Sequence, residues 1–266
     1  MRTIVIGDIH GNFKALDQVL TRSGYDPKSD RLICMGDYVD GYPDSYKVVE
    51  LLIECDNYSG GRNVYLRGNH DEWIQDALNN SRRQLQSGDT DYIRRRYDHM
   101  WYQGGNNTYK SYVNQIDPKP NYDLHAEFFN NLSLYWIENN IAFVHAGWDT
   151  TLYSDLEDAA KLDPELLIWD RTLFHRAEHL QYLLNKGYTV TDVKTKFGNF
   201  DKIFVGHTAV DADYNDIFPN LQVCNIVNVD TGAGWVGKLT GYVLETGEIF
   251  QSDYCEDLYP NHSPRN

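Results

Sequence analysis

The sequence "VIGDIHGN" (residues 5–12) ends an apolar, strand-like run with an aspartate and a histidine. Strand-like runs end in Asp, Asn or His at four further places: "MGDYVD" (35–40), "RGNHD" (67–71), "FVHAG" (143–147) and "FVGHT" (204–208). In open α/β sheets, ligand-binding groups gather beyond the carboxyl ends of the strands. We therefore expect Asp, Asn and His side chains from several strands to meet at one edge of the fold.

The first 80 residues alternate between predicted strands and helices. Strands are expected at 2–6, 31–35 and 63–67, and helices at 13–23, 43–55 and 71–79. Asn12 is a suitable N-cap for the first helix, and Gly24 is suited to end it. Asp8 and Asp37 are 29 residues apart, and Asp37 and Asn69 are 32 apart, as in strand–helix–strand units of roughly 30 residues. This spacing predicts that the three side chains lie at equivalent ends of neighbouring strands.

A different pattern follows between residues 72 and 124. The stretch is polar, aromatic and rich in Gly and Asn, as in "WYQGGNNTYKSY" (101–112), and has no strand pattern. We predict a mainly helical insertion there. Because segments that follow a strand's carboxyl end tend to overhang the site, the insertion is either a substrate cap or a surface excursion without a role.

The remaining sequence predicts further strands, one helical region and an irregular strap after Ser252. The helical region is expected at 156–188, with a break near Pro164, and the strands at 134–137, 141–144, 202–205, 225–229, 238–243 and 248–251. No linker or repeat divides the chain. Residues 1–266 are therefore expected to form a single α/β domain.

Composition excludes several classes of function. The chain has 266 residues and a formal net charge of −15. Because this charge repels nucleic acid and anionic lipid, neither nucleic acid nor membrane is an expected partner. The four cysteines form no C-x-x-C pair, and no apolar run has the length of a membrane span. A strand is expected from residue 2 onward, so no signal peptide is expected. A cytoplasmic protein is expected, and its oligomeric state is left open.

The side chains at the strand ends form a plausible set of metal donors, with imidazole, carboxylate and amide groups but no thiolate. They are Asp8, His10, Asp37, Asn69, His145 and His207. Mixed nitrogen and oxygen ligation suits Mn²⁺, Fe or Zn²⁺. Such a set overfills a single site, so two divalent ions about 3.5–4 Å apart fit better. Asp37 is the expected bridge, because its strand lies between the other two in sequence and a carboxylate has two oxygens.

The run "GDIHG … GDYVD … RGNHD … HAG … GHT" resembles the metallophosphoesterase superfamily. Within it, the closest resemblance is to the phosphoprotein phosphatases, the Ser/Thr phosphatases, in their bacterial and phage-type branch. The motifs span residues 7–208 and are far more specific in combination than singly. The resemblance implies a four-layer sandwich of two packed mixed β-sheets flanked by helices. It also implies two divalent metal ions, with Mn²⁺ expected and Fe or Zn²⁺ as alternatives.

The resemblance assigns a role to each motif residue. His70 would be the general acid that protonates the leaving oxygen, with Asp40 as its hydrogen-bond partner. Arg67 and Arg171 would contact the substrate phosphate. The first metal would be held by Asp8 and His10, the second by Asn69, His145 and His207, and both by Asp37.

These residue types suit phosphoester hydrolysis. The reaction needs hydroxide at neutral pH, and a metal lowers the pKa of bound water from about 15.7 toward roughly 7. A hydroxide that bridges the metals would attack phosphorus in line, while the cations and guanidinium groups neutralise the phosphate oxygens. A positioned acid contributes typically about 10²–10⁴-fold.

Several of these residues also have ordinary structural explanations. Asp40 could cap a turn, Arg67 could form a surface ion pair, and Arg171 could pair with Asp170 or another carboxylate. Asp71 is expected to begin a helix, where its charge suits the helix dipole. The remaining histidines match no motif and are expected in the core or on the surface: His99, His125, His175, His179 and His262.

Two departures from the family pattern bear on the substrate. Gly41 stands where the protein phosphatases carry a phosphate-binding arginine, which basic clusters of the insertion, at 82–83 and 94–96, could replace. The motif "GNHD" replaces the eukaryotic GNHE, and Asp at this place also occurs in bacterial diadenosine-tetraphosphate hydrolases.

The expected function is therefore a phosphomonoesterase like the Ser/Thr protein phosphatases, acting on a phosphorylated protein, a phosphopeptide or a small phosphoester. The alternative is a dinucleoside polyphosphate hydrolase. A catalytically inactive scaffold of the same fold is disfavoured, because all the expected ligands, His70 and Asp40 are present.

Overall fold

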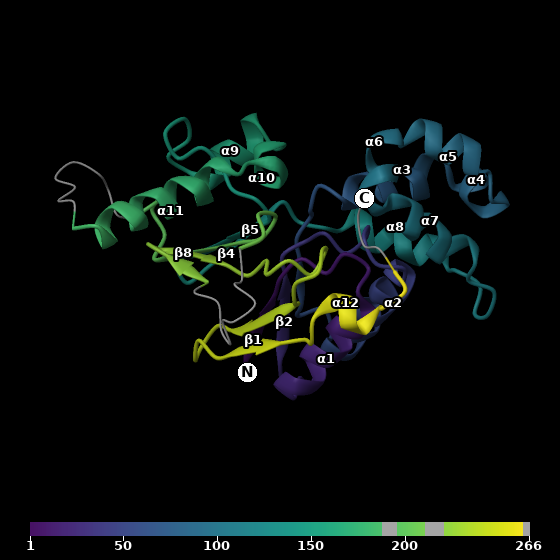
Figure 1. The fold of residues 1–266 in the computed structure, drawn as a ribbon, viewed down its shortest axis with the longest axis horizontal. Helices are drawn as coiled ribbons and strands as arrows, with labels where there is room; N and C mark the ends of the chain where they lie inside the picture. The colour runs from purple at the N-terminus through teal and green to yellow at the C-terminus, as the bar shows by residue number, and fades with distance from the viewer. Residues whose placement is uncertain (188–195, 211–220, 263–266) are drawn as a thin grey trace.

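Two five-stranded mixed β-sheets form the centre of the protein (Figure 1). The computed structural model describes residues 1–187, 196–210 and 221–262. The first sheet comprises, in spatial order, β10 (Ile249–Gln251), β9 (Thr240–Val243), β1 (Thr3–Ile6), β2 (Arg31–Cys34) and β3 (Val64–Tyr65). The second comprises β4 (Tyr135–Glu138), β5 (Ile141–Val144), β6 (Lys202–Val205), β8 (Ile226–Asn228) and β7 (Gln222–Val223).

Each sheet contains three consecutive parallel strands. These are β1, β2 and β3 in the first sheet and β5, β6 and β8 in the second. The outer strands β9, β10, β4 and β7 pair antiparallel with their neighbours. Because parallel strands end at the same edge of a sheet, the loops that follow them are brought together there.

The alternation of side chains along β1 shows how the layers pack. Ile4 and Ile6 are buried in a cluster with the residues of the neighbouring helices, whereas Val5 lies in a cluster that spans the two sheets. In that cluster, the rings of Phe143 and Phe204 stack with their centroids 5.1 Å apart. The sheets therefore pack face to face, and the predicted α/β sandwich is confirmed.

The helices that follow β1 and β2 cover the outer face of the first sheet. They are α1 (Phe13–Ser23) and α2 (Ser45–Ser59). As predicted, the Asn12 side chain caps α1, accepting the backbone N–H of Ala15 at 3.0 Å. Gly24 ends the helix with a left-handed φ of 60°.

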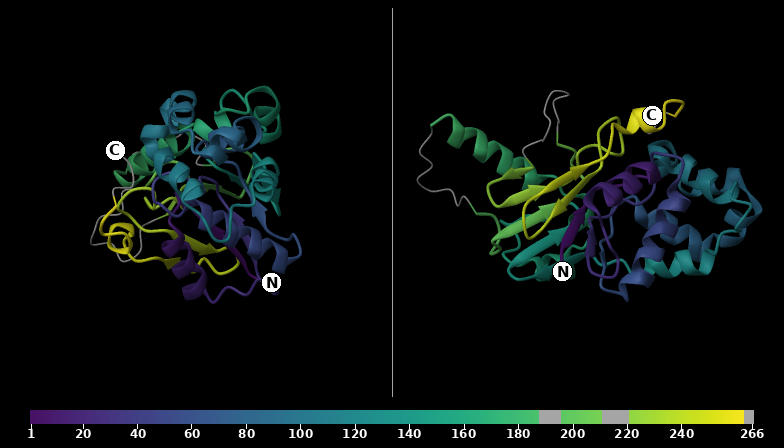
Figure 2. Two further views of the ribbon diagram at one scale, coloured as in Figure 1. Left: turned by 90° about the vertical axis from the view of Figure 1, so that its right-hand side faces the viewer. Right: turned by 90° about the horizontal axis from the view of Figure 1, so that it is seen from below.

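The predicted insertion is helical and without strands in the described chain. We call its helices the cap helices; Figure 1 shows them gathered at one end of the molecule, away from α11. They are α3 (Asp71–Asn80), α4 (Arg82–Ser87), α5 (Thr90–Arg96), α6 (Asp98–Met100), the π-helical turn η1 (Trp101–Gly105), α7 (Asn106–Val113) and α8 (Tyr122–Asn130). Their aromatic residues, including Trp73, Tyr109 and Tyr112, join the core cluster of the first sheet. The right-hand view of Figure 2 shows the cap helices at one end of the molecule and α11 (Thr172–Asn185) at the other, with the sheets between them.

The helical region predicted at 156–188 is three helices, α9 (Leu156–Leu162), α10 (Leu166–Trp169) and α11 (Thr172–Asn185). The break near Pro164 is present, and a second break falls at Asp170, whose ψ of 133° leaves the helix. The Asp170 carboxylate accepts the backbone N–H of Leu173 at 3.1 Å and so stabilises the first turn of α11. The predicted last residue, Tyr188, lies outside the described residues.

Smaller differences concern short elements. The strand β7 was not expected from the sequence, and the strap after Ser252 contains the short helix α12 (Cys255–Leu258).

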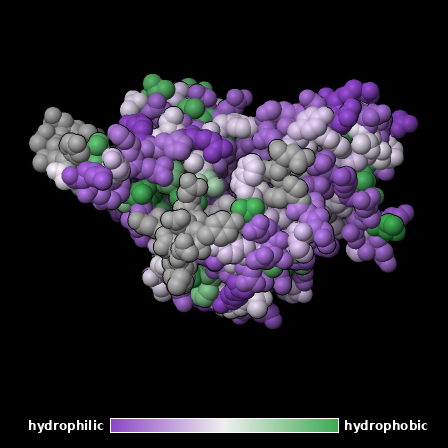
Figure 3. Space-filling model, viewed as in Figure 1, coloured by the Kyte–Doolittle hydropathy of each residue, from purple (hydrophilic) through white to green (hydrophobic). Residues whose placement is uncertain are grey.

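Figure 3 shows a face dominated by hydrophilic side chains, in keeping with the charged composition. Within the described ranges, none of the helices combines the length and apolar character needed to cross a membrane.

Candidate metal centre

The loops after β1, β2, β3, β5 and β6 bring together the six side chains predicted as metal ligands. All are buried: Asp8, His10, Asp37, Asn69, His145 and His207. The first sheet supplies the first four, and the second sheet supplies the two others. The site therefore lies where the parallel strands of both sheets end.

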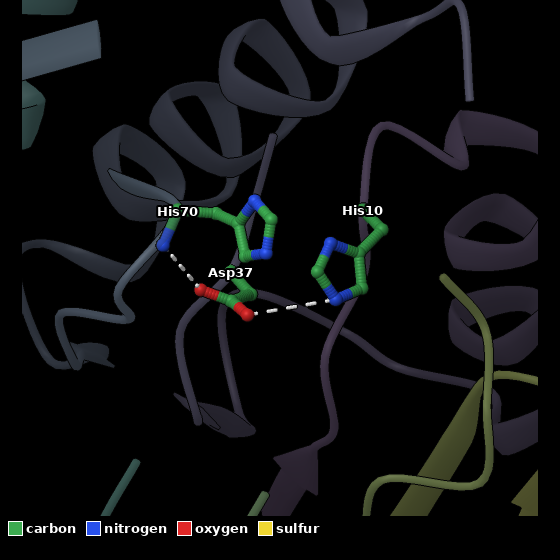
Figure 4. A group of neighbouring side chains, drawn as sticks. All are labelled: His10, Asp37 and His70. Atoms are coloured by element: carbon green, nitrogen blue, oxygen red, sulfur yellow. Dashed lines mark hydrogen bonds and ion pairs between the residues drawn. The ribbon is translucent and has the colours of Figure 1, made fainter. Parts of the chain in front are cut away.

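Asp37 lies between two groups of donors. Its Oδ2 atom is 3.5 Å from Nε2 of His10 and 3.5 Å from Nε2 of His145. One group combines Asp37 with His10 and His70, and the other combines it with His145 and His207; in each, the ligand atoms lie within 4.8 Å of one another. Figure 4 shows the first group, with the imidazole of His10 directed at the Asp37 carboxylate. A residue common to both groups has the position that a bridging ligand requires.

Hydrogen bonds to backbone carbonyls orient two of the imidazole rings. Nδ1 of His10 lies 3.1 Å from the carbonyl of Val39 and 3.0 Å from that of Asp40, and Nδ1 of His145 lies 2.8 Å from that of Met35. Because a carbonyl only accepts, these Nδ1 atoms are assigned the hydrogen, and each Nε2 lone pair is left for a metal.

His207 provides the strongest sign that a cation belongs here. Its Nε2 atom is buried and has no hydrogen-bond partner among the described residues. Burial lowers the pKa of His207 to about 3, and burial likewise lowers that of His145. Neutral imidazoles are the form that binds metal. The donor chemistry and this unsatisfied nitrogen therefore fit a pair of divalent ions.

Glycines leave the space that the ligands occupy. A Cβ atom on Gly206 would lie 2.2 Å from Oδ1 of Asp8, and one on Gly68 would lie 2.1 Å from Oδ1 of Asp37. A side chain on Gly234 would likewise collide with the His10 ring, at 2.3 Å. The glycines of "GNH" and "GHT" are thus required by the ligands' close approach.

Four residues of these loops have left-handed backbone conformations although they are not glycine. They are His10 (φ 51°), Asp37 (φ 52°), Asp40 (φ 67°) and His207 (φ 63°). Such conformations cost on the order of 1–3 kcal/mol each and persist at functional sites, where the surroundings enforce them. Their concentration here marks these loops as functional.

The predicted general acid and its partner are in contact. Nδ1 of His70 lies 2.8 Å from Oδ2 of Asp40, and both residues are buried. The imidazole of His70 packs edge-on against that of His10, with the ring centroids 5.0 Å apart. Asp40 thus interacts with His70 and does more than cap a turn.

The two predicted phosphate-binding arginines differ in position. Arg171 lines the cavity over the donors and donates from Nη1 to the carbonyl of His207 at 2.9 Å. Asp170, offered as its alternative partner, instead accepts from Thr172 and Leu173. Arg67 does not line this cavity among the described residues, and its buried Nε atom has no hydrogen-bond partner there.

The cavity over the donors has a volume of about 320 Å³. Besides predicted site residues, its walls include three residues that the sequence analysis did not single out: Gln103, Trp169 and Trp235. Asp230 and His175 line it as well, so His175, expected as an ordinary residue, lies at the site. Neither basic cluster of the insertion reaches the cavity; Arg82 pairs with Asp123, and Arg96 pairs with Asp76 at 2.9 Å.

Sequence reasoning missed the part played by Asp71. It begins α3, as predicted, but its carboxylate accepts backbone N–H groups of Asp37, Tyr38 and Gly68 at 2.8–2.9 Å. The sequence feature that could have indicated this role is the position of Asp71 directly after the "GNH" motif. In the described chain, none of the other unmatched histidines lines the cavity: His99 packs against Trp169, with the ring centroids 6.4 Å apart, and His125 is buried between Tyr112 and Glu50.

Two sheets whose parallel strands end at paired groups of His, Asp and Asn donors define a metal-dependent phosphoesterase. A family model described as "Calcineurin-like phosphoesterase" matches residues 1–211, and the chain belongs to this family. The resemblance to metallophosphoesterases is thereby confirmed.

Relatives with two different activities are similar to the chain over most of its length. "Serine/threonine-protein phosphatase 1" of Salmonella typhimurium is 24% identical, over 89% of this chain and 88% of its own. A symmetrical bis(5'-nucleosyl)-tetraphosphatase of Pseudomonas entomophila is also 24% identical, over 100% and 99%. The crystal structure of a metallophosphoesterase from Sphaerobacter thermophilus shares the fold, with a TM-score of 0.52, 17% identity, and coverage of 96% of this chain and 89% of that one.

Proposed function

We propose that this protein is a phosphomonoesterase that depends on two divalent metal ions and removes phosphate from phosphorylated Ser or Thr side chains. The observation that carries the proposal is one cavity of about 320 Å³ whose walls include four of the six donors (His10, Asp37, Asn69 and His207), Arg171, and His70, which Asp40 holds from behind. This volume is at the lower end of small-molecule sites. It suits a phosphorylated side chain better than a substrate with two nucleosides.

The proposed ligands of the first ion are Asp8 and His10, those of the second are Asn69, His145 and His207, and Asp37 is shared. We propose Mn²⁺ as the native metal, with Fe or Zn²⁺ as alternatives that suit the same donors. When bound, such ions lower the pKa of a coordinated water and offset the negative charge of a phosphate group.

The protein's own groups have separate proposed roles. His70, held at Nδ1 by Asp40, protonates the leaving oxygen. Arg171 contacts the phosphate oxygens from the cavity wall. Arg67, which is not among the residues that line the cavity, is proposed as a second contact only from its place in the "RGNH" motif. The cap helices are proposed as a substrate cap within a single domain of residues 1–266, since Gln103 from this region lines the cavity.

A specific observation favours a second candidate, a dinucleoside polyphosphate hydrolase. The indoles of Trp169 and Trp235 lie in the cavity wall and are 41% and 48% exposed. Aromatic side chains at the edge of a phosphate site can stack on nucleobases. This second function would use the same metal ions and the same general acid, but the rim of the cavity would bind a nucleobase in place of a peptide.

The test begins with protein stripped of metal by a chelator. We expect no hydrolysis of p-nitrophenyl phosphate until Mn²⁺ is restored, and a loss of about 10²-fold or more in His70→Asn. Hydrolysis of a phosphoserine peptide and of diadenosine tetraphosphate is then compared. A higher kcat/KM for the nucleotide overturns the proposed substrate class, and no hydrolysis of any substrate supports an inactive scaffold.

A further inference from the structure

The buried carboxylate of Asp40 is held by three donors, of which His70 is only one. Nδ1 of His70 and Nε1 of Trp73 each lie 2.8 Å from Oδ2, and the hydroxyl of Thr108 lies 2.8 Å from Oδ1. Because an ionised carboxylate only accepts, His70 is assigned its hydrogen on Nδ1. This leaves Nε2 of His70 as the atom that can serve the substrate.

The hydroxyl of Thr108 has its full set of hydrogen bonds. It donates to Oδ1 of Asp40 and accepts the backbone N–H of Asp40 at 2.9 Å. Oγ of Ser45 lies 2.9 Å away and, since the threonine hydrogen is already used, acts as the donor. Thr108 and Ser45 are fully buried. The contact therefore fixes both the carboxylate and the backbone of Asp40.

The cap also holds the backbone next to Asp40. Nδ2 of Asn107 donates to the carbonyl of Gly41 at 2.7 Å, and a Cβ on Gly104 would lie 2.2 Å from the Gly41 nitrogen. Asp40 and Gly41 have φ values of 67° and 111°. Segment 104–108 thus encloses a loop that is held in an unfavourable conformation.

This arrangement accounts for the glycine at position 41. A Cβ there would lie 3.1 Å from the His10 carbonyl oxygen and 3.2 Å from its Cβ, at a φ that disfavours any side chain. The backbone of the cap lies against the same loop. The positive φ of residue 41, against which the cap backbone packs, therefore disfavours an arginine at this position.

We infer that Thr108 and Trp73 are positioning residues for the Asp40–His70 pair, so that the cap helices take part in orienting the general acid. The inference rests on the proposed function. Thr108 comes from α7 and Trp73 from α3, and both act through Asp40 without contacting the reacting atoms. The cap is thereby a part of the catalytic apparatus as well as a cover.

Substrates with different leaving groups separate this role from a purely structural one. Protonation by an acid is important when the leaving group is a strongly basic phenolate or alkoxide, and nearly irrelevant for 2,4-dinitrophenolate. A misdirected His70 therefore slows phenyl phosphate much more than 2,4-dinitrophenyl phosphate. A loss of folded protein or of metal slows both substrates equally.

The experiment uses the metal-loaded protein and the variants Thr108→Val, Thr108→Ser and Trp73→Phe. We expect Thr108→Val and Trp73→Phe to lower kcat for phenyl phosphate by about 10-fold or more and that for 2,4-dinitrophenyl phosphate by less than about 2-fold. Thr108→Ser keeps the hydroxyl and is expected to restore the rate. Ser111→Ala removes a hydroxyl from the same helix, one that bonds Thr108 only through its carbonyl, and is expected to leave both rates unchanged.

A readout without metal or substrate completes the test. In ¹⁵N spectra of the metal-free protein, His70 is expected as the Nδ1–H tautomer in the wild type and as a tautomer mixture in Thr108→Val. Equal slowing of both substrates by the two variants, or no slowing, overturns the inference while the proposed function stands. If the wild type hydrolyses neither aryl phosphate, the proposed function fails and the inference with it.

Discussion

Asp71 accepts the backbone N–H of Asp37 at 2.9 Å, so a carboxylate at the start of α3 holds the residue shared by the two donor groups. The same Oδ2 atom accepts the N–H of Gly68 at 2.8 Å, and Oδ1 accepts that of Tyr38 at 2.9 Å. Asp71 is fully buried. It therefore ties the loop after β2 to the loop after β3, and the donors of both loops depend on it.

Asp71→Asn tests this tie. The asparagine amide has only one oxygen to accept the three backbone N–H groups, and its NH₂ group would face N–H donors with which it cannot bond. We therefore expect the free energy of unfolding to fall by about 2–3 kcal/mol. Mn²⁺ affinity is expected to fall about 10–100-fold, as for other supports of metal ligands. Urea unfolding and metal titration measure both. Asp17→Asn, an exposed change on α1, is the control; an Asp71→Asn protein with unchanged metal affinity contradicts the role.

Gly206→Ala tests the close approach of Asp8. The added methyl would lie 2.2 Å from Oδ1 of Asp8, so we expect metal content after dialysis to drop and activity to be lost. Gly61→Ala is the control: no atom lies within 4 Å of its Cβ, and its φ is 74°. It is expected to cost about 1 kcal/mol of backbone strain and to keep its metal. Equal metal content in the two variants would show that the space beside Asp8 is not needed.

Arg171→Ala tests the proposed phosphate contact. Loss of a charged hydrogen bond to phosphate is expected to lower kcat/KM about 10–100-fold, mainly by raising KM. Arg176→Ala removes a guanidinium from α11 that lies 3.6 Å from Asp149 and does not line the cavity. Steady-state kinetics with p-nitrophenyl phosphate should separate the two variants, and similar KM values would count against a phosphate contact by Arg171.

The buried histidine of the cap predicts how stability depends on pH. Burial lowers the pKa of His125, against the opposing effect of Glu50. The unfolded chain then binds more protons below pH about 6.5, so stability present at neutral pH is lost as the pH falls. Between about pH 7.5 and 5.5, the wild type should therefore lose more of its unfolding free energy than His125→Phe. Parallel pH dependences in urea unfolding would rule out this contribution.

The sequence predicted the parts of the fold that depend on local patterns. Hydrophobic runs ending in "GD", "GNH" and "GHT" located the central strands, and Asn12 and Gly24 located the ends of α1. The strand β7, only two residues long, carries too little pattern to be found. The second break in the region after residue 156 depends on the capping carboxylate of Asp170, which looks like an ordinary helix residue in the sequence.

The supports of the site were less predictable than its donors. Donor residues follow strands directly, so their position in the chain reveals their position in space. Thr108 lies 68 residues from Asp40, and its contact depends on how the cap helices pack against the loop after β2. Similarly, the exposed indole of Trp169 reaches the cavity only because α10 ends beside it.

Metal stoichiometry tests most directly whether the donors hold two cations that share Asp37. Chelator-stripped protein is dialysed against Mn²⁺, and bound metal per chain is measured for the wild type, His207→Ala and Asp37→Asn. We expect about two ions in the wild type, about one in His207→Ala, and fewer than one in Asp37→Asn, because this carboxylate belongs to both groups. A wild type that binds no metal, or an Asp37→Asn protein that retains two ions, would contradict a shared dinuclear centre.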